Sequence, residues 1–187
     1  MSVHLGVGDR RRFAKMAFDF RPRDAFHRVM GDGSIVDRAT GEIIWRLGRE
    51  TLASQHYPHE LSNGNILIFD NGTYRQNVAL NYSRIIEVDR LTKNIVWEYT
   101  DTPPHNFFSP YISGAQRLPN GNTLITEGNY GRLFEVTAGK QIVWEYVNPY
   151  FAPQQVTADG SPAVQGQQNS VFRAFRYASA RIPWLKA

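Results

Sequence analysis

A repeat of about 50 residues limits the possible folds of this chain more than any other feature of its sequence. Three segments end alike: IVDRATGEIIWRL (residues 35–47), IIEVDRLTKNIVWEY (85–99) and LFEVTAGKQIVWEY (133–146). Each reads as an apolar strand, a turn, and a strand rich in β-branched residues that closes on Trp45, Trp97 or Trp144. The recurrence predicts repeated β-hairpins, with the tryptophans packing between neighbouring repeats.

A second unit, L-x-N-G-N-x-L-I, precedes two of these hairpins. Its dipeptides Asn63-Gly64 and Asn120-Gly121 predict type I′ turns between two strands. Thr40-Gly41 and Ala138-Gly139 are predicted to turn the hairpins that end on tryptophan. One full repeat therefore contains four antiparallel strands, which is the blade of a β-propeller.

The expected fold is all-β: a partial β-propeller of about two and a half four-stranded antiparallel blades. We expect a half blade at about residues 26–50 and whole blades at about 52–100 and 109–148, within a propeller domain at 26–150. Residues 1–25 are expected to form an atypical basic N-terminal arm, and residues 151–187 a C-terminal tail with a closing strand. Because propellers close with roughly 4 to 8 blades, the count favours a fragment of a longer propeller. A ring of several copies and a tail that folds back are the alternatives.

The charge of the chain is concentrated near its beginning. Residues 1–28 carry seven Lys and Arg against three acidic residues. This excess equals the net charge of +4 of the whole chain, so basic and acidic residues are equal in number in the rest of the chain. A nucleic-acid reader places its positive charge on a folded recognition surface, so we expect no nucleic-acid partner. The absence of cysteine excludes disulfides and thiolate chemistry. No stretch approaches the roughly 20 apolar residues of a membrane span, and MSVHLGVGDRRRF lacks the apolar core of a signal peptide.

The order of several longer motifs resembles that of a known family. DRATGEIIWRLG, QHYPHELSNGNILIFDNG, YSRIIEVD, SGAQRLPNGNTLITEG and VFRAFRY follow one another along the chain. Together, over about residues 26–177, they resemble the C-terminal half of the bacterial arylsulfotransferase-like propeller family. DRATGEIIW is also similar to the repeats of quinoprotein (PQQ-like) propellers and indicates only a blade. The Gln55-His56 pair ahead of FDNG and YSR is the more specific feature.

The resemblance implies a transferase that moves a sulfuryl group from an aryl sulfate to a phenol, without PAPS or any other cofactor and without a metal. It implies a ping-pong mechanism in which His56 is the nucleophile and is transiently sulfated, with Arg28 stabilising the sulfate oxygens. Two further histidines of the family lie on upstream blades that this sequence lacks, so the resemblance implies impaired or no activity for the chain alone. It also implies a periplasmic or secreted protein, although the sequence leaves localisation open.

The residue types are compatible with this chemistry. A neutral imidazole is a competent nucleophile near neutral pH, and a guanidinium recognises sulfate oxygens with two hydrogen bonds. The sequence alignment places Ser113 opposite His56, and we expect Gln55, His59 and Asn71 to contribute to substrate binding. The alternative is that His56 is a structural loop residue in a non-catalytic propeller that binds a partner or forms a scaffold. A homo-oligomer that supplies the missing blades is a further expectation.

Overall fold

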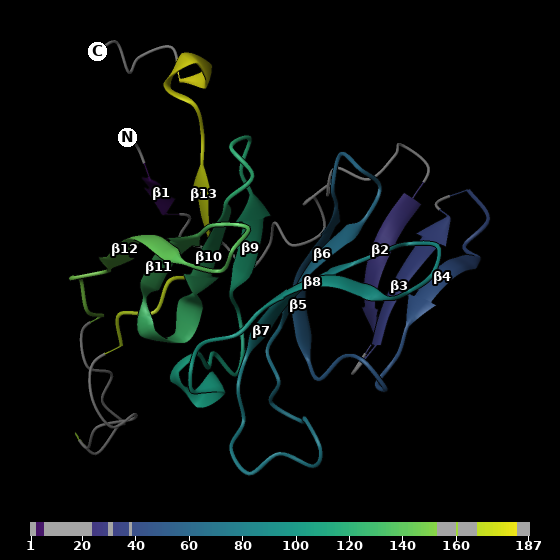
Figure 1. Ribbon diagram of the computed structural model, residues 1–187, viewed down its shortest axis with the longest axis horizontal. Coiled ribbons are helices and arrows are strands. Elements are labelled where there is room, and N and C mark those ends of the chain that lie inside the picture. The colour runs from purple at the N-terminus through teal and green to yellow at the C-terminus, as the bar shows by residue number, and fades with distance from the viewer. Residues whose placement is uncertain are drawn as a thin grey trace.

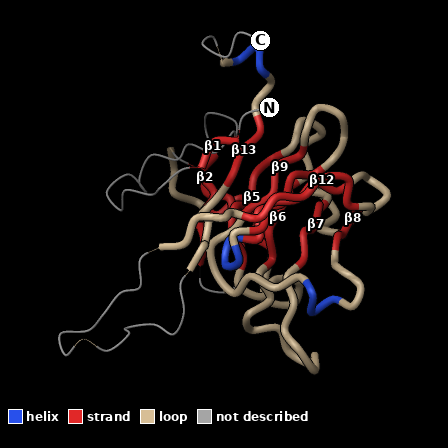
Figure 2. The backbone as a smooth tube through the Cα atoms, turned by 90° about the vertical axis from the view of Figure 1, so that its left-hand side faces the viewer, coloured by secondary structure: helices blue, strands red, loops and turns tan. Residues whose placement is uncertain are grey.

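The computed structural model describes residues 3–5, 24–29, 32–37, 39–152, 160 and 168–182. Over these residues the protein consists of antiparallel strands, with helix limited to short 3₁₀ turns in the connections (Figures 1 and 2). The expected all-β class and its four-stranded antiparallel sheets are thereby confirmed. In this part of the chain, no helix is long and apolar enough to cross a membrane.

Two sheets contain four strands in chain order, as a propeller blade does. The first sheet contains β5 (Gln55–Glu60), β6 (Ile66–Asp70), β7 (Arg84–Val88) and β8 (Ile95–Tyr99). The second contains β9 (Gly114–Arg117), β10 (Thr123–Glu127), β11 (Arg132–Val136) and β12 (Ile142–Val147). Three 3₁₀ turns, η2 (Pro104–Asn106), η3 (Gly128–Tyr130) and η4 (Ser179–Arg181), lie between or after strands.

Two smaller sheets flank these blades. One contains β2 (Asp24–Val29), β3 (Asp32–Asp37) and β4 (Ile43–Leu47), and the other pairs β1 (Val3–Leu5) with β13 (Ala174–Arg176). Two strands from near the opposite ends of the sequence therefore pair in one sheet (Figure 1).

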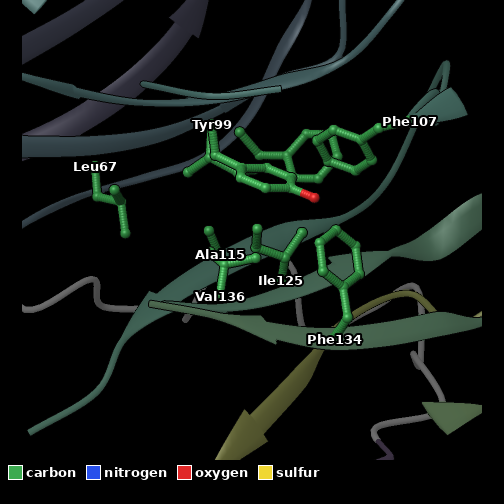
Figure 3. Close-up of a cluster of buried hydrophobic side chains, with 9 residues drawn as sticks. Leu67, Tyr99, Phe107, Ala115, Ile125, Phe134 and Val136 are labelled. Atoms are coloured by element: carbon green, nitrogen blue, oxygen red, sulfur yellow. The ribbon is translucent and has the colours of Figure 1, made fainter. Parts of the chain in front are cut away.

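The sheets stack face to face. Because successive residues of β6 point to opposite sides, this strand packs against a neighbouring sheet on each face. Ile66 and Ile68 pack in one buried cluster with Ile35 of β3. Leu67 and Phe69 pack in another, together with residues of the second four-stranded sheet (Figure 3). All five residues of β6 are buried. The first four-stranded sheet is consequently enclosed on both faces, which is a propeller-like arrangement.

The repeated tryptophans join each sheet to the next. Trp45 Nε1 donates a hydrogen bond of 2.9 Å to the carbonyl of Arg90, in the β7–β8 turn. Trp97 Nε1 donates an equally long bond to the carbonyl of Ala138, in the β11–β12 turn. The packing expected of these two tryptophans agrees with this geometry.

The short strand β13 repeats the contacts of β9 one sheet further on. Arg117 of β9 binds Glu87 at 2.8 Å and its guanidinium lies 4.7 Å from the centre of a Trp97 ring. Arg176 of β13 binds Glu135 and lies 4.7 Å from Trp144 in the same way. Because β9 contacts both β5 and β13, these three strands follow one another along the inner edge of the stack. Strand β13 therefore takes the place of the first strand of a further sheet.

The turns differ from the sequence prediction. Gly64 and Gly121 have φ of 86°, but Asn63 and Asn120 are not left-handed, so these are not type I′ turns. The amide of each glycine donates to the carbonyl three residues earlier, at Leu61 or Leu118. The loops are thus type I turns followed by a left-handed glycine. In a three-residue loop of this kind the glycine adopts the positive φ, and the asparagine does not need to. In the β11–β12 turn the left-handed residue is Lys140, with φ of 70°, and not Gly139.

Candidate functional site

The strand that carries His56 is interrupted by a β-bulge. In β5, Gln55 pairs with Asp70 and His56 with Phe69, but the next paired residue is His59, opposite Leu67. One extra residue is accommodated here, and Tyr57 adopts a left-handed φ of 47°. Bulges of this kind redirect side chains and often lie next to functional sites.

The bulge changes which residue corresponds to His56 in the second sheet. There the pairing of β9 with β10 is regular, and Gly114 lies opposite Thr126. Thr126 corresponds to Phe69, since each lies one residue before the acidic end of its strand. The structural counterpart of His56 is therefore Gly114 and not Ser113. The sequence alignment of His56 with Ser113 is therefore wrong by one residue. The bulge adds one residue to β5 between His56 and the NG turn, and the alignment did not allow for it.

A hydrogen bond to Asn71 fixes the orientation of the His56 ring. His56 Nδ1 lies 2.6 Å from Asn71 Oδ1. Asn71 Nδ2 donates to the carbonyls of Ser109, at 2.6 Å, and Ile112, at 3.1 Å. Because only the amide nitrogen can donate to two carbonyls, Oδ1 must face the histidine as an acceptor. His56 Nδ1 consequently carries a proton, and in the neutral ring the lone pair resides on Nε2.

Asn71 is itself held firmly between the two four-stranded sheets. Its side chain is fully buried, and its carbonyl accepts a 2.8 Å hydrogen bond from Ser83 Oγ. Ser83 Oγ in turn accepts a 2.9 Å hydrogen bond from the amide of Ser109. A buried, fully bonded amide of this kind is rigid. The position of His56 is therefore set by the contact between sheets as well as by its own strand.

Asp70, which precedes Asn71, belongs to a structural ion-pair network. Its buried carboxylate accepts hydrogen bonds from Arg75 Nη2 and Arg84 Nε, both at 2.9 Å, and from the amide of Ala53 at 2.7 Å. The second sheet repeats this feature where Arg132 binds Glu127 at 3.2 Å and Glu145 at 2.5 Å. Because the arrangement recurs in both sheets, it fastens strand ends and does not mark the site.

The other residues predicted for the site lie close to His56 along the chain or on a neighbouring strand. Gln55 is fully buried, and His59 has its ring centre 4.9 Å from that of Tyr57. The backbone of Arg28 pairs with Gly33 in the adjacent sheet, and its strand β2 contacts β5. The side chain of Arg28 lies outside the described part of the structure. Arg49, which follows β4, is exposed.

A cleft of about 1090 Å³ runs beside the inner strands. Its aromatic wall is formed by Tyr57 and His59 of β5, Phe175 of β13, and Tyr177. Phe175 and Tyr57 meet edge to face, with ring centres 5.5 Å apart. An aromatic cleft that also contains polar groups suits a small aryl ligand. Within the described ranges, no cluster of three or more His, Asp or Glu side chains could hold a metal ion.

Two residues of this region were not predicted from the sequence patterns. Tyr57 stood inside the quoted motif QHYPHELSNGNILI, but a tyrosine in a strand reads as packing. Arg173 stood in the quoted segment VFRAFRY, which the repeat marked only as a closing strand. Its guanidinium lies 3.7 Å from the centre of the Tyr57 ring, although 116 positions separate the two residues. No local pattern predicts a contact of this range.

The stacked sheets, the inner strands and the oriented histidine define a propeller-like β-protein with a candidate site at the start of β5. The sequence matches the arylsulfotransferase (ASST) family over residues 47–149, more than half of the chain. The protein therefore belongs to the arylsulfotransferase family, which confirms the resemblance seen in its motifs.

The fold is similar to a solved structure that carries no functional description. A crystal structure of a protein of unknown function from Bacteroides caccae aligns with a TM-score of 0.50 and 14% sequence identity. The alignment covers 73% of this chain and 47% of that protein, so the chain spans less than half the length of this relative. No curated protein matches the sequence. The likeness supports the all-β architecture alone.

Proposed function

We propose that this chain carries the nucleophile of a PAPS-independent arylsulfotransferase, and that His56 accepts the sulfuryl group. The observation that carries the proposal is the 2.6 Å hydrogen bond between His56 and Asn71, within a match to the arylsulfotransferase family. This bond assigns the proton to Nδ1 and the lone pair to Nε2, and a nucleophilic imidazole needs that arrangement.

The proposed reaction has two balanced steps. The Nε2 lone pair of His56 attacks the sulfur of an aryl sulfate, an N–S bond forms, and the S–O bond to the aryl group breaks. Its electron pair leaves on the phenolate oxygen, which takes a proton from water. In the second step the oxygen of an acceptor phenol, which gives up its proton to water, attacks the same sulfur. The N–S bond breaks, and its electron pair returns to Nε2.

Asn71 has a specific part in this scheme. When Nε2 bonds to sulfur, the ring becomes positively charged, and the acceptor Oδ1 of Asn71 stabilises the proton on Nδ1. We therefore propose Asn71 as a positioning residue that acts through His56. Its amide hydrogens are directed at Ser109 and Ile112, which supports this assignment over direct contact with substrate.

The remaining expected residues keep proposed contacts with the substrate. Arg28, on a strand adjoining β5, is proposed to bind the sulfate oxygens, with Gln55 and His59 beside the donor. The substrates are proposed to be aryl sulfates and phenols, in line with the family. Because two further family histidines lie outside this sequence, we expect little turnover by the 187-residue chain alone.

Labelling with an aryl sulfate tests the proposal. Incubation with 4-nitrophenyl sulfate should leave an acid-labile sulfuryl group on His56, located by mass spectrometry of peptides kept at alkaline pH. His56→Ala should abolish labelling, and Arg28→Ala should slow it by ~10²-fold. Asn71→Ala should slow it as well, while His59→Ala should have a milder effect.

The matched control is His105→Ala, which removes an exposed histidine of η2 and should leave labelling unchanged. The proposal fails if another residue is labelled, or if His56→Ala is labelled at the wild-type rate. If neither the chain nor a longer relative acquires a label, the site binds without catalysis.

A further inference from the structure

The side chain of Arg173 crosses the inner edge of the sheet stack. The residue precedes β13 and is only 8% exposed. A Cβ atom placed on Gly114 would lie 3.1 Å from Arg173 Nε and 3.3 Å from Cδ, so the arginine passes directly over this glycine. Its guanidinium carbon reaches the ring of Tyr57, 3.7 Å from the ring centre, on the far side of β9. One side chain thus spans from β13 to β5.

The guanidinium and the proposed nucleophile approach the same short segment of chain. Asn71, which orients His56, donates to the carbonyl of Ile112, two residues before Gly114. Tyr57, on which Arg173 stacks, follows His56 directly. Residues 112–114 are therefore bordered by the His56–Asn71 pair and by Arg173. A Cβ at position 114 would press on the arginine side chain, which would have to shift to make room.

The chemistry of Arg173 suits an oxyanion. Burial lowers the pKa of its guanidinium to about 10, so the group still carries its charge at neutral pH. Stacking on an aromatic ring engages the flat face of a guanidinium, whereas its N–H donors lie in the plane and point outward. In that geometry two donors match two oxygens of a sulfuryl group. Tyr57 also lines the cleft of about 1090 Å³, so the cleft and the Arg173 guanidinium meet at the same tyrosine ring.

We infer that Arg173 binds the sulfuryl oxygens of the aryl sulfate donor beside His56, while the aryl group lies in the cleft against Tyr57. This inference rests on the proposed function and adds a residue from outside the family match at 47–149. Arg173 would contact the substrate directly and stabilise negative charge on the oxygens, with no bond formed or broken at the guanidinium.

A binding experiment separates this contact from catalysis. The probe is 2-naphthalenesulfonate, a stable aryl anion that has no sulfate ester to transfer, and its neutral partner is methyl 2-naphthyl sulfone. Both are titrated into the full chain and followed by ligand fluorescence. Wild type should prefer the sulfonate, and Arg173→Met should weaken sulfonate binding by about 10-fold or more, the usual cost of losing a charge-assisted hydrogen bond. Arg46→Met, which removes the same charge from an exposed position on β4, should bind as wild type does.

The inference is overturned if Arg173→Met binds the sulfonate as tightly as wild type, or if wild type binds the sulfone equally well. Should Arg173→Met fail to fold, as judged by near-UV circular dichroism, Gly114→Ala decides. It keeps the charge but displaces the guanidinium, so it should weaken sulfonate binding several-fold, and an unchanged affinity contradicts the inference. Since His56→Ala should lose the covalent label yet retain sulfonate binding, the two proposals fail separately.

Discussion

At the scale of single residues, two differences between the repeats set the candidate site apart. The counterpart of His56 in the second sheet is Gly114, and the residue that follows Glu127, as Asn71 follows Asp70, is Gly128. A Cβ at Gly128 would lie 2.5 Å from the carbonyl of Val171 and 2.8 Å from the side chain of Ile112. The second sheet therefore has no room for an asparagine there. Of the two four-stranded sheets, only the first contains the histidine–amide pair.

Glu127 gives a prediction about pH at this scale. Burial raises the pKa of its carboxyl above the ordinary 4.5, despite the opposing effects of the Phe108 amide and Arg132. A carboxyl with a raised pKa in the folded state contributes stability at low pH, and this contribution is lost as the pH rises through that pKa. Relative to Glu127→Gln, the wild type should therefore lose melting temperature as the pH rises from below the ordinary carboxyl value of 4.5 towards neutrality.

Thermal unfolding of both proteins, followed by circular dichroism across this range, measures the effect. Glu42→Gln, at an exposed turn position, is the control and should follow the wild type. If the melting temperatures of wild type and Glu127→Gln changed in parallel with pH, ionisation of Glu127 would not affect the stability of the fold, and the prediction would be wrong.

At the scale of elements, the residue with a left-handed backbone conformation determines where each hairpin turn requires a glycine. Gly121 has φ of 86° and Lys140 has φ of 70°, whereas Gly139 does not have a positive φ. A glycine is therefore required at position 121 for its backbone conformation, while the glycine at 139 is not. The two glycines lie in hairpin turns of the same sheet, so they form a matched pair.

We predict that Gly121→Ala lowers the free energy of unfolding by ~1–2 kcal/mol, the cost of a left-handed residue with a Cβ. No atom lies within 4 Å of the added methyl group, so sterics add nothing. Gly139→Ala, whose nearest neighbour would be Thr137 Oγ1 at 3.6 Å, should be neutral or stabilise by up to ~1 kcal/mol. Urea unfolding measures both, and equal effects would contradict the assigned turn conformations.

At the scale of the whole molecule, stability depends on contacts between sheets. The bond from Trp45 to the Arg90 carbonyl joins the three-stranded sheet to the first four-stranded sheet, and Trp45 is 8% exposed. Trp45→Phe keeps an aromatic ring but removes the donor, so the carbonyl loses its partner in the neighbouring sheet. The expected cost is ~1–3 kcal/mol of unfolding free energy.

The control for this prediction is Tyr74→Phe, which also removes one polar group from an aromatic side chain but at a position that is 78% exposed. It should change the unfolding free energy by less than ~0.5 kcal/mol. If Trp45→Phe were as neutral as this control, the indole bond would not hold the sheets together.

The sequence by itself predicted the strands of the two four-stranded sheets, their order within each sheet, and the family. The repeated tryptophans, the NG turns and the apolar strand residues are local patterns, and side-chain periodicity along a strand depends only on neighbours in the chain. The resemblance to the family motif pointed to His56 and Asn71 as site residues. The family match at residues 47–149 rests on these same patterns.

Only the tertiary structure decided the register and the contacts of the site. The bulge at Tyr57 moved the counterpart of His56 to Gly114, because pairing depends on the partner strand and not on counting along one chain. The tautomer of His56 follows from carbonyls at 109 and 112, and the approach of Arg173 to Tyr57 from the stacking of β5, β9 and β13. Such contacts join distant positions through packing, and packing arises only when the sheets assemble around a common inner edge.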